Sequence, residues 1–227
     1  MIVLTGASGG IGNAILPALA ALDDVIAIYR RSPPDFAAET NCVPYQLDLT
    51  SEPEVQKFVA SMGNSLRQIT VVHAAAVKID GLAAQFSTED WEAVLDVNLR
   101  GNFFLTRALL VPMISDKWGR VIHLSAIAGM RAAIGGIAYS TSKTGLLGMS
   151  RALSQEYARF GITSNVLVLG YFNAGMYSVL SETIRKDLLR VIPSGQLGDP
   201  SNIVHAVEFL IKASYVNGSA IHIDGGV

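Results

Sequence analysis

The sequence predicts a single α/β domain in which a doubly wound, seven-stranded parallel sheet is flanked by helices. Short apolar runs suited to buried strands alternate with helical stretches throughout the 227 residues, the pattern of parallel βαβ units. The length fits one such domain, and no linker is found that would divide residues 1–227. A glycine-rich turn between the first strand and the first helix indicates a ligand at the carboxyl ends of the strands.

Each predicted element rests on a local pattern. Ser51 and Ser87, each with an acid three residues later, indicate helix starts, and the segment 32–43 leaves little room for a crossover helix. The predicted strands are 2–4, 25–29, 43–47, 69–72, 121–124, 163–169 and 220–223. The predicted helices are 11–22, 52–62, 90–114, 139–160, 180–191 and one that follows residue 200.

The stretch Thr5-Gly6-Ala7-Ser8-Gly9-Gly10-Ile11-Gly12 joins the first strand to the first helix. Glycines allow the backbone to approach a phosphate closely, and the free N–H groups of a helix N-terminus bind its negative charge. Such a turn is weak evidence alone, but its place between a strand and a helix is typical of a Rossmann-type, dinucleotide-binding domain.

Two arginines, Arg30 and Arg31, follow the second predicted strand. In a dinucleotide fold, an acid at this strand end binds the ribose 2′-hydroxyl, whereas arginine accommodates a 2′-phosphate. The absence of an acid in Tyr29-Arg-Arg-Ser therefore favours NADP(H) over NAD(H). The alternative is that both arginines are solvated surface charges.

Tyr139 and Lys143 lie four positions apart at the start of a predicted helix, so their side chains share one face. An adjacent ammonium favours the tyrosine phenolate, whose usual pKa is about 10, and such a pair suits acid–base chemistry on an alcohol or carbonyl. The same spacing also occurs on ordinary helices. Asn98, in the middle of the 90–114 helix, would by itself be a surface or interface residue.

Composition excludes several classes of function. The net charge of −2 comes without a basic stripe, which argues against a nucleic-acid partner. Charged residues interrupt every apolar run before about 18 residues, so no membrane span is expected, and without a signal sequence the cytoplasm is the expected location. Cys42 is the only cysteine, and the four histidines are scattered as ordinary strand and helix residues, so no metal site is predicted.

The chain is also rather apolar. Half of its residues are hydrophobic, and the mean hydropathy is +0.38. The excess apolar surface fits subunit interfaces, and the 90–114 and 139–160 helices are more apolar than one sheet face requires. We therefore expect a homo-oligomer.

These motifs resemble the short-chain dehydrogenase/reductase family over essentially the whole chain. The glycine turn matches the family's cofactor loop, Asp48-Leu49 its adenine contact, Asn98 its helix asparagine and Tyr139-x-x-x-Lys143 its catalytic pair. The cofactor-binding positions that the resemblance implies are Gly6, Ser8, Gly10, Ile11, Gly12, Arg30, Arg31, Asp48, Leu49, Ala74, Ala75, Tyr139, Lys143 and Gly170.

Within the family, three sequence segments are similar to segments of the 3-oxoacyl-acyl-carrier-protein reductases. They are Tyr139-Ser-Thr-Ser-Lys-Thr-Gly-Leu, Gly161-Ile-Thr-Ser-Asn-Val and His222-Ile-Asp-Gly-Gly. This resemblance implies a small-molecule or acyl-carrier-bound carbonyl substrate, a homo-tetramer or homo-dimer, and a partly apolar substrate lid at about 172–196 that includes Tyr177, Leu180, Ile184 and Leu188.

The resemblance also implies a mechanism. Hydride would pass between the nicotinamide and a substrate carbon while Tyr139 gives or takes the proton of the oxygen. Lys143 would hold the nicotinamide ribose and lower the Tyr139 pKa, and Asn98 would hold a water that links Lys143 to solvent.

The chain departs from the family at the catalytic serine. That serine precedes the tyrosine by 13 positions, where this sequence has Ala126. Gly129, three residues later, supports the same alignment with the family. Ser125 is the neighbour, but successive strand residues point to opposite faces, so its hydroxyl should aim away from the substrate. Loss of one donor to a developing oxyanion lowers the rate by about 10²–10³-fold. The alanine is either a natural loss or an engineered substitution.

Three further mismatches lie near the expected cofactor. The family's Asn-Asn-Ala-Gly turn is replaced by a segment from His73 to Ala76, and its Pro-Gly after the sixth strand by Leu169-Gly170. The threonine that touches the nicotinamide carboxamide is replaced by Ala174, with Asn173 beside it as a substitute. The sequence is that of a divergent member.

Two functions therefore compete. The first is an NADPH-dependent ketoreductase, which the survival of Tyr139, Lys143 and Asn98 favours. The second is a catalytically silent NADP(H)-binding subunit or sensor, which Ala126 and Ala174 favour.

Overall fold

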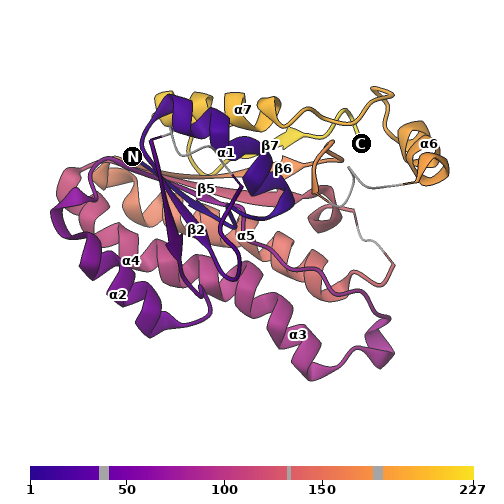
Figure 1. Cartoon of the computed structure of the whole chain (residues 1–227), viewed down its shortest axis with the longest axis horizontal. Helices are drawn as coiled ribbons and strands as arrows, with labels where there is room; N and C mark the ends of the chain where they lie inside the picture. Colours follow the sequence, from indigo (N-terminus) through magenta and orange to yellow (C-terminus); the bar gives the residue numbers. More distant parts are fainter. Residues whose placement is uncertain (36–40, 132–133, 176–180) are drawn as a thin grey trace.

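The computed structural model describes residues 1–35, 41–131, 134–175 and 181–227 (Figure 1). Seven parallel strands form one sheet in the order β3-β2-β1-β4-β5-β6-β7, which confirms the predicted fold class. β5 is longer at both ends than its apolar run indicated. The strands are β1 Ile2–Thr5, β2 Val25–Tyr29, β3 Cys42–Gln46, β4 Ile69–His73, β5 Gly119–Ala126, β6 Ile162–Leu169 and β7 Ala220–Ile223.

Helices cover both faces of the sheet (Figure 1). One face carries α1 (Gly10–Leu22) and α7 (Ser201–Lys212), and the other carries α2 (Glu52–Met62), α4 (Gly101–Asp116) and α5 (Ile137–Tyr157). Each face has its own apolar core. In β5, Val121 enters the core under α2 and α4, whereas Ile122 and Leu124 enter the core under α1 and α7, as expected for strands buried on both faces.

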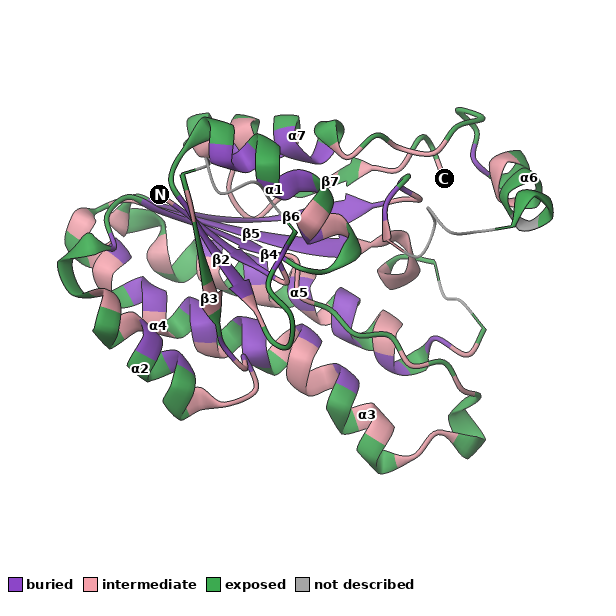
Figure 2. Ribbon diagram, in the orientation of Figure 1, coloured by how far each residue is buried: buried purple, intermediate pink, exposed green. Residues whose placement is uncertain are grey.

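The central strands are buried along their length, while β3 at the sheet edge is largely exposed (Figure 2). Pro44 lies inside β3, and proline cannot donate to a strand on its outer side, so this segment fits only an edge. Ser51 and Ser87 cap α2 and α3 (Thr88–Leu95) as predicted, accepting from the N–H groups of Glu54 and Asp90. No helix lies in the described part of the connection between β2 and β3.

The predicted helix at 90–114 is present as an uninterrupted helical stretch, but its middle is not α-helical. α3 ends at Leu95, a π-helical turn spans Asp96–Arg100, and α4 begins at Gly101. A π-turn inserts one extra residue and is found most often at functional sites. A Cβ at Gly101 would lie 3.0 Å from the Leu49 Cβ, so glycine lets this bend pack closely against the loop after β3.

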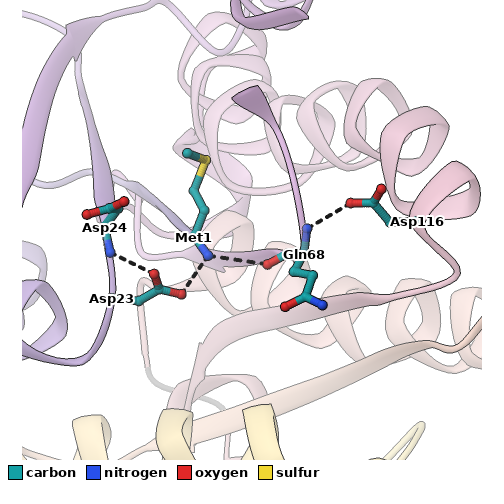
Figure 3. Close-up of polar contacts among 5 residues, drawn as sticks. All are labelled: Met1, Asp23, Asp24, Gln68 and Asp116. Carbon is teal, nitrogen blue, oxygen red and sulfur yellow. Dashed lines mark hydrogen bonds and ion pairs between the residues drawn. The ribbon is translucent and has the colours of Figure 1, made fainter. Parts of the chain in front are cut away.

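Polar contacts tie together the amino ends of the strands (Figure 3). The Met1 amine contacts Asp23 Oδ2 at 2.5 Å and the Gln68 carbonyl at 3.4 Å, and Asp24 N donates to the other Asp23 oxygen. Gln68 N in turn donates to Asp116 Oδ2 at 2.8 Å. These contacts lie at the end of the sheet opposite the glycine turn, which leaves the carboxyl edge for a ligand.

Three short 3₁₀ turns follow helices or strands, namely η1 (Gly63–Ser65), η4 (Ile127–Gly129) and η5 (Ala158–Phe160), and a fourth, η2 (Ala83–Gln85), precedes α3. Among the described residues, no helix is both long and apolar enough to cross a membrane. Those residues also contain no group of three or more side chains arranged to hold a metal ion.

Candidate active site

The glycine turn forms a cradle that larger residues would fill. Gly6 has φ of +64°, and a Cβ on Gly12 would lie 2.1 Å from the Gly6 carbonyl oxygen. Gly9 precedes α1 without a side-chain cap, and the first turn of α1 contains no acid. The free N–H groups at this helix start are therefore available to a pyrophosphate, with Ser8 exposed and Ile11 half-buried beside them.

Thr5 holds the segment after the neighbouring strand β4 against this cradle, a contribution that the sequence reasoning missed. Its buried Oγ1 accepts from the N–H groups of both Ala74 and Ala75 at 3.1 Å. A Cβ on Gly6 would lie 2.6 Å from the Ala75 Cα. Thr5, Gly6, Ala74 and Ala75 thus meet where β1 and β4 end, which is the switch point of the sheet.

A pocket continues from the cradle across the ends of β2 and β3. Its lining includes Gly6, Tyr29, Arg30, Asp48, Leu49 and Ala75. Arg30 Nε lies 2.9 Å from Asp48 Oδ2, and the Arg30 side chain remains 54% exposed. Burial raises the pKa of Asp48, but bonds from Thr50 and the charge of Arg30 outweigh it and hold that pKa below its usual value. Arg31, the next residue, is exposed.

Tyr139 and Lys143 lie on the first turns of α5, as the spacing predicted. Tyr139 is half-buried, and Lys143 is 3% exposed, with its Nζ 5.6 Å from the centre of the Tyr139 ring. Lys143 Nζ donates to the Leu124 carbonyl at 2.7 Å. Burial lowers the pKa of this ammonium to about 8, which suits a group that gains and loses protons near neutrality.

Asn98 lies in the π-turn and braces the catalytic helix. Its Oδ1 accepts from Val77 N at 2.8 Å, and its Nδ2 donates to the Val77 carbonyl and to Ser142 Oγ. Ser142, which the sequence reasoning missed, donates to the Tyr139 carbonyl at 2.7 Å. Both amide hydrogens of Asn98 are thereby used in bonds within the protein. The relay water predicted at Asn98 is not tested, and these two hydrogens are not available to hold it.

The hydroxyl of Ser125 is turned toward α5. It donates to the Lys143 carbonyl at 2.9 Å, and the side chain is 2% exposed. Ala126, the last residue of β5, is half-buried in extended backbone and is paired in register with Leu169 of β6. The strand alternation expected from the sequence thus holds, and Ser125 is committed to holding the backbone of α5.

Histidines at two strand positions meet behind this site. His73 is the last residue of β4, paired in register with His123 of β5, and their rings stack with centroids 5.0 Å apart. The sequence reasoning treated both as ordinary strand residues. Neither the stacking nor the burial of the pair follows from the positions of the two residues along the chain.

The segment after β6 closes the other side of the cradle. A Cβ on Gly10 would lie 2.0 Å from the Gly175 Cα, so only glycines allow this approach. A Cβ on Gly170 would lie 2.6 Å from the Asp224 Cα, and Ala174 is buried while Asn173 is exposed.

Beyond residue 175 the expected lid is described only in part. Tyr177 and Leu180 lie outside the described residues, and so does the side chain of Ile184. α6 (Glu182–Val191) stands beyond the carboxyl edge of the sheet, with Leu188 half-buried (Figure 1).

Comparison with known proteins agrees with this geometry. A family profile described as short chain dehydrogenase matches residues 1–185. The chain is 34% identical to the 3-oxoacyl-acyl-carrier-protein reductase FabG of Rickettsia conorii, over 99% of this chain and 95% of that protein. It is 33% identical to an acetoacetyl-CoA reductase of Shinella zoogloeoides, over 99% and 96%.

A solved structure shares the fold. A provisionally assigned gluconate dehydrogenase of Agrobacterium tumefaciens superposes with a TM-score of 0.89 at 23% identity, covering 100% of this chain and 94% of that one. The cradle, the Tyr139–Lys143 pair and these similarities together show that the chain is an oxidoreductase of the short-chain dehydrogenase/reductase family, whose members use a nicotinamide cofactor.

Proposed function

We propose that the protein is an NADPH-dependent ketoreductase that acts on a 3-oxoacyl thioester or a related ketone. The single observation that carries the proposal is the buried Lys143 ammonium beside the Tyr139 ring. The names of two relatives, a 3-oxoacyl-acyl-carrier-protein reductase and an acetoacetyl-CoA reductase, both describe the reduction of 3-oxoacyl thioesters.

The choice of NADPH rests on the end of β2. Arg30 and Arg31 follow the strand at whose end a dinucleotide fold meets the adenosine ribose, and the acid that lines this pocket, Asp48, comes from the end of β3 and is paired with Arg30. Arg30 pairs with Asp48 while more than half of its side chain stays exposed. A 2′-phosphate would share this guanidinium with Asp48, which leaves Arg31 to complete its neutralisation.

The chain's own residues supply the acid–base chemistry. When bound, NADPH supplies the hydride. Tyr139 donates its phenolic proton to the substrate oxygen, and the adjacent Lys143 ammonium stabilises the phenolate that remains. The Asn98–Ser142 contacts hold the first turn of α5 in place, which fixes the position of Tyr139 relative to the cradle.

Ala126 is the reason to keep a second candidate. At the family's serine position it offers only a methyl group, so the substrate oxygen lacks one donor. A silent NADP(H)-binding subunit or sensor would retain the cradle and the arginines and turn over no carbonyl compound. The retained Tyr139 and Lys143, with their contacts intact, favour the enzyme.

The test is NADPH oxidation with acetoacetyl-CoA, a simple ketone and an aldehyde, each repeated with NADH. We expect turnover with the thioester and a preference for NADPH. Tight binding of NADPH by calorimetry without oxidation by any of the three substrates, in the wild type and in Ala126→Ser alike, would support the sensor instead.

We also propose that the protein assembles as a homo-tetramer. On α4, Phe103 is 42% and Val111 is 71% exposed, which leaves apolar surface on a helix that packs beside the catalytic helix. Solution scattering should give a mass of four chains. A monomeric mass would contradict the proposal.

A further inference from the structure

Four buried residues form a polar cluster behind Lys143 that the proposed chemistry does not use. This inner cluster consists of His73 on β4, His123 on β5, and Asn102 and Thr106 on α4. Each of the four is at most 1% exposed. The planes of the two stacked imidazoles differ by only 9°, so both rings fill one layer between the sheet and α4.

The inner cluster has more hydrogen-bonding capacity than the protein satisfies. His73 Nε2 lies 2.8 Å from Thr106 Oγ1, and Asn102 Nδ2 donates to the Asn98 carbonyl at 2.9 Å. In the described part of the chain, no protein group bonds either nitrogen of His123. His73 Nδ1 and Asn102 Oδ1 also lack a well-formed bond, although a side-chain interaction with Asn102 raises the pKa of His73. Buried polar atoms are nearly always satisfied by protein or by ordered water.

Lys143 has the complementary need. Its ammonium carries three N–H donors, and among the residues that the structure describes it donates to the Leu124 carbonyl. Leu124 is the residue after His123, and Ser125, on the same strand face as His123, holds the Lys143 backbone. His123 therefore lies in the layer that α5 covers, next to the ammonium.

Both imidazoles are neutral in this position. Burial first, and the charge of Lys143 second, lower the pKa of His123 to about 3. Burial likewise holds the pKa of His73 well below its usual range, with smaller contributions from His123 and Lys143. A neutral imidazole offers one N–H and one lone pair, so each ring can both donate to and accept from a water molecule.

We propose that His123, with His73 and Asn102, holds ordered water between the inner cluster and Lys143, and that this water accepts a hydrogen bond from the ammonium. The lining groups are neutral and provide both donors and acceptors, which suits water and not an ion. The inference rests on the proposed role of Lys143 and gives its ammonium a hydrogen-bond acceptor other than the Asn98 side chain, whose amide hydrogens are already used.

The consequence is that His123 is a positioning residue. An acceptor on the ammonium favours its charged form and so opposes the burial that lowers the Lys143 pKa. The titratable groups that act on one another around the proposed water are Lys143 from α5 and the two imidazoles from β4 and β5. α4 contributes the neutral Asn102 and Thr106, and the charged residues of the π-turn, Asp96 and Arg100, pair with each other, so a change at His123 acts on the protonation of Lys143.

The first test is a crystal structure of the wild-type protein at high resolution, with and without NADPH. We expect an ordered water within about 3.2 Å of a His123 nitrogen and of Lys143 Nζ. A dry inner cluster would overturn the proposal. This readout needs no turnover, so it remains decisive if the proposed reaction itself is refuted, for instance by activity that survives Tyr139→Phe.

The second test compares the pH profiles of kcat/KM for two variants. His123→Phe keeps the stacked ring but removes both nitrogens. We expect the alkaline limb of its pH profile to move down by about one pH unit, because the Lys143 ammonium loses one hydrogen bond. His123→Gln keeps a donor and an acceptor and should retain the wild-type profile. Identical profiles for both variants would contradict the role of His123.

A matched control is available on β6. Thr163 is 4% exposed, and its Oγ1 also finds no partner among the described residues, but it is paired in register with Arg120 at the amino end of the sheet. Thr163→Val should leave the pH profile unchanged. If His123→Phe does not fold, the position of water in the wild-type crystal decides the question.

Discussion

The two ends of the nucleotide-binding edge are built in opposite ways. At the acid–base end, Asn98, Ser125, Ser142 and Lys143 are 0–3% exposed, and each makes a hydrogen bond to another element of the fold. At the adenosine end, Arg30 is 54% exposed beside the edge strand β3. A substitution at the first end alters folding and chemistry together, whereas one at the second end alters the choice of cofactor alone.

The largest effect is expected at Lys143, the group in which stability and catalysis conflict. Its folded pKa, about 8 against 10.5 for the free side chain, means that folding disfavours the charged form. The destabilisation is complete below about pH 8 and disappears as the pH rises toward 10.5, because the unfolded chain then binds the extra proton. Activity that requires the ammonium should fall above about pH 8.

Lys143→Met therefore separates the two contributions. We expect kcat/KM to fall by at least about 10²-fold, while the free energy of unfolding at pH 7 rises by about 1–3 kcal/mol. Denaturant unfolding of the cofactor-free protein at pH 7 and pH 10 measures the second effect, which should shrink at the higher pH. A wild type more stable than the variant at pH 7 would contradict a penalised buried ammonium.

The next effect concerns the missing hydroxyl. Ala126→Ser should raise the turnover of a 3-oxoacyl thioester by about 10²–10³-fold, because it adds one donor to the developing oxyanion. Steady-state NADPH oxidation measures the change. Ser125→Ala is the matched control, and we expect it to lower stability through loss of the bond to the Lys143 carbonyl without raising turnover. An Ala126→Ser enzyme no faster than wild type would show that this position does not limit the reaction.

The smallest effect is expected at the adenosine end. Arg30→Ala and Arg31→Ala should each raise KM for NADPH by about 10-fold, the loss of about 1.4 kcal/mol of phosphate binding, and leave KM for NADH within about twofold. Arg67→Ala is the control, since Arg67 is 72% exposed and pairs with Asp116 at the opposite edge of the sheet. Equal losses for both cofactors would point to a structural role for the arginines.

The sequence was sufficient where a local pattern determines a local structure. Short apolar runs between helical stretches located all seven strands, and the Ser51 and Ser87 patterns located two helix starts. The alternation of strand residues also predicted that Ser125 aims away from the substrate, and its hydroxyl is bonded to the Lys143 carbonyl. Strand ends were less precise, because a strand continues through small and polar residues such as Gly119 when its neighbours supply hydrogen bonds.

It was insufficient where the structure depends on register between distant segments. The π-turn at Asn98 has no mark in the sequence, because Asp96–Arg100 contains neither glycine nor proline and also fits an ordinary helix. The stacking of His73 on His123 requires β4 and β5 to pair in one particular register. Ser142 is simply a spacer of the Tyr139-x-x-x-Lys143 motif until the fold places it against Asn98.

The central claim is that Tyr139 gives the proton to the reduced carbonyl. The most direct measurement is the single-turnover rate of NADPH oxidation by Tyr139→Phe with acetoacetyl-CoA, after NADPH binding and thermal unfolding have been shown to match the wild type. We expect the rate to fall by at least about 10²-fold, because phenylalanine keeps the ring and removes only the proton donor. A rate equal to that of the wild type would contradict the mechanism proposed for this site.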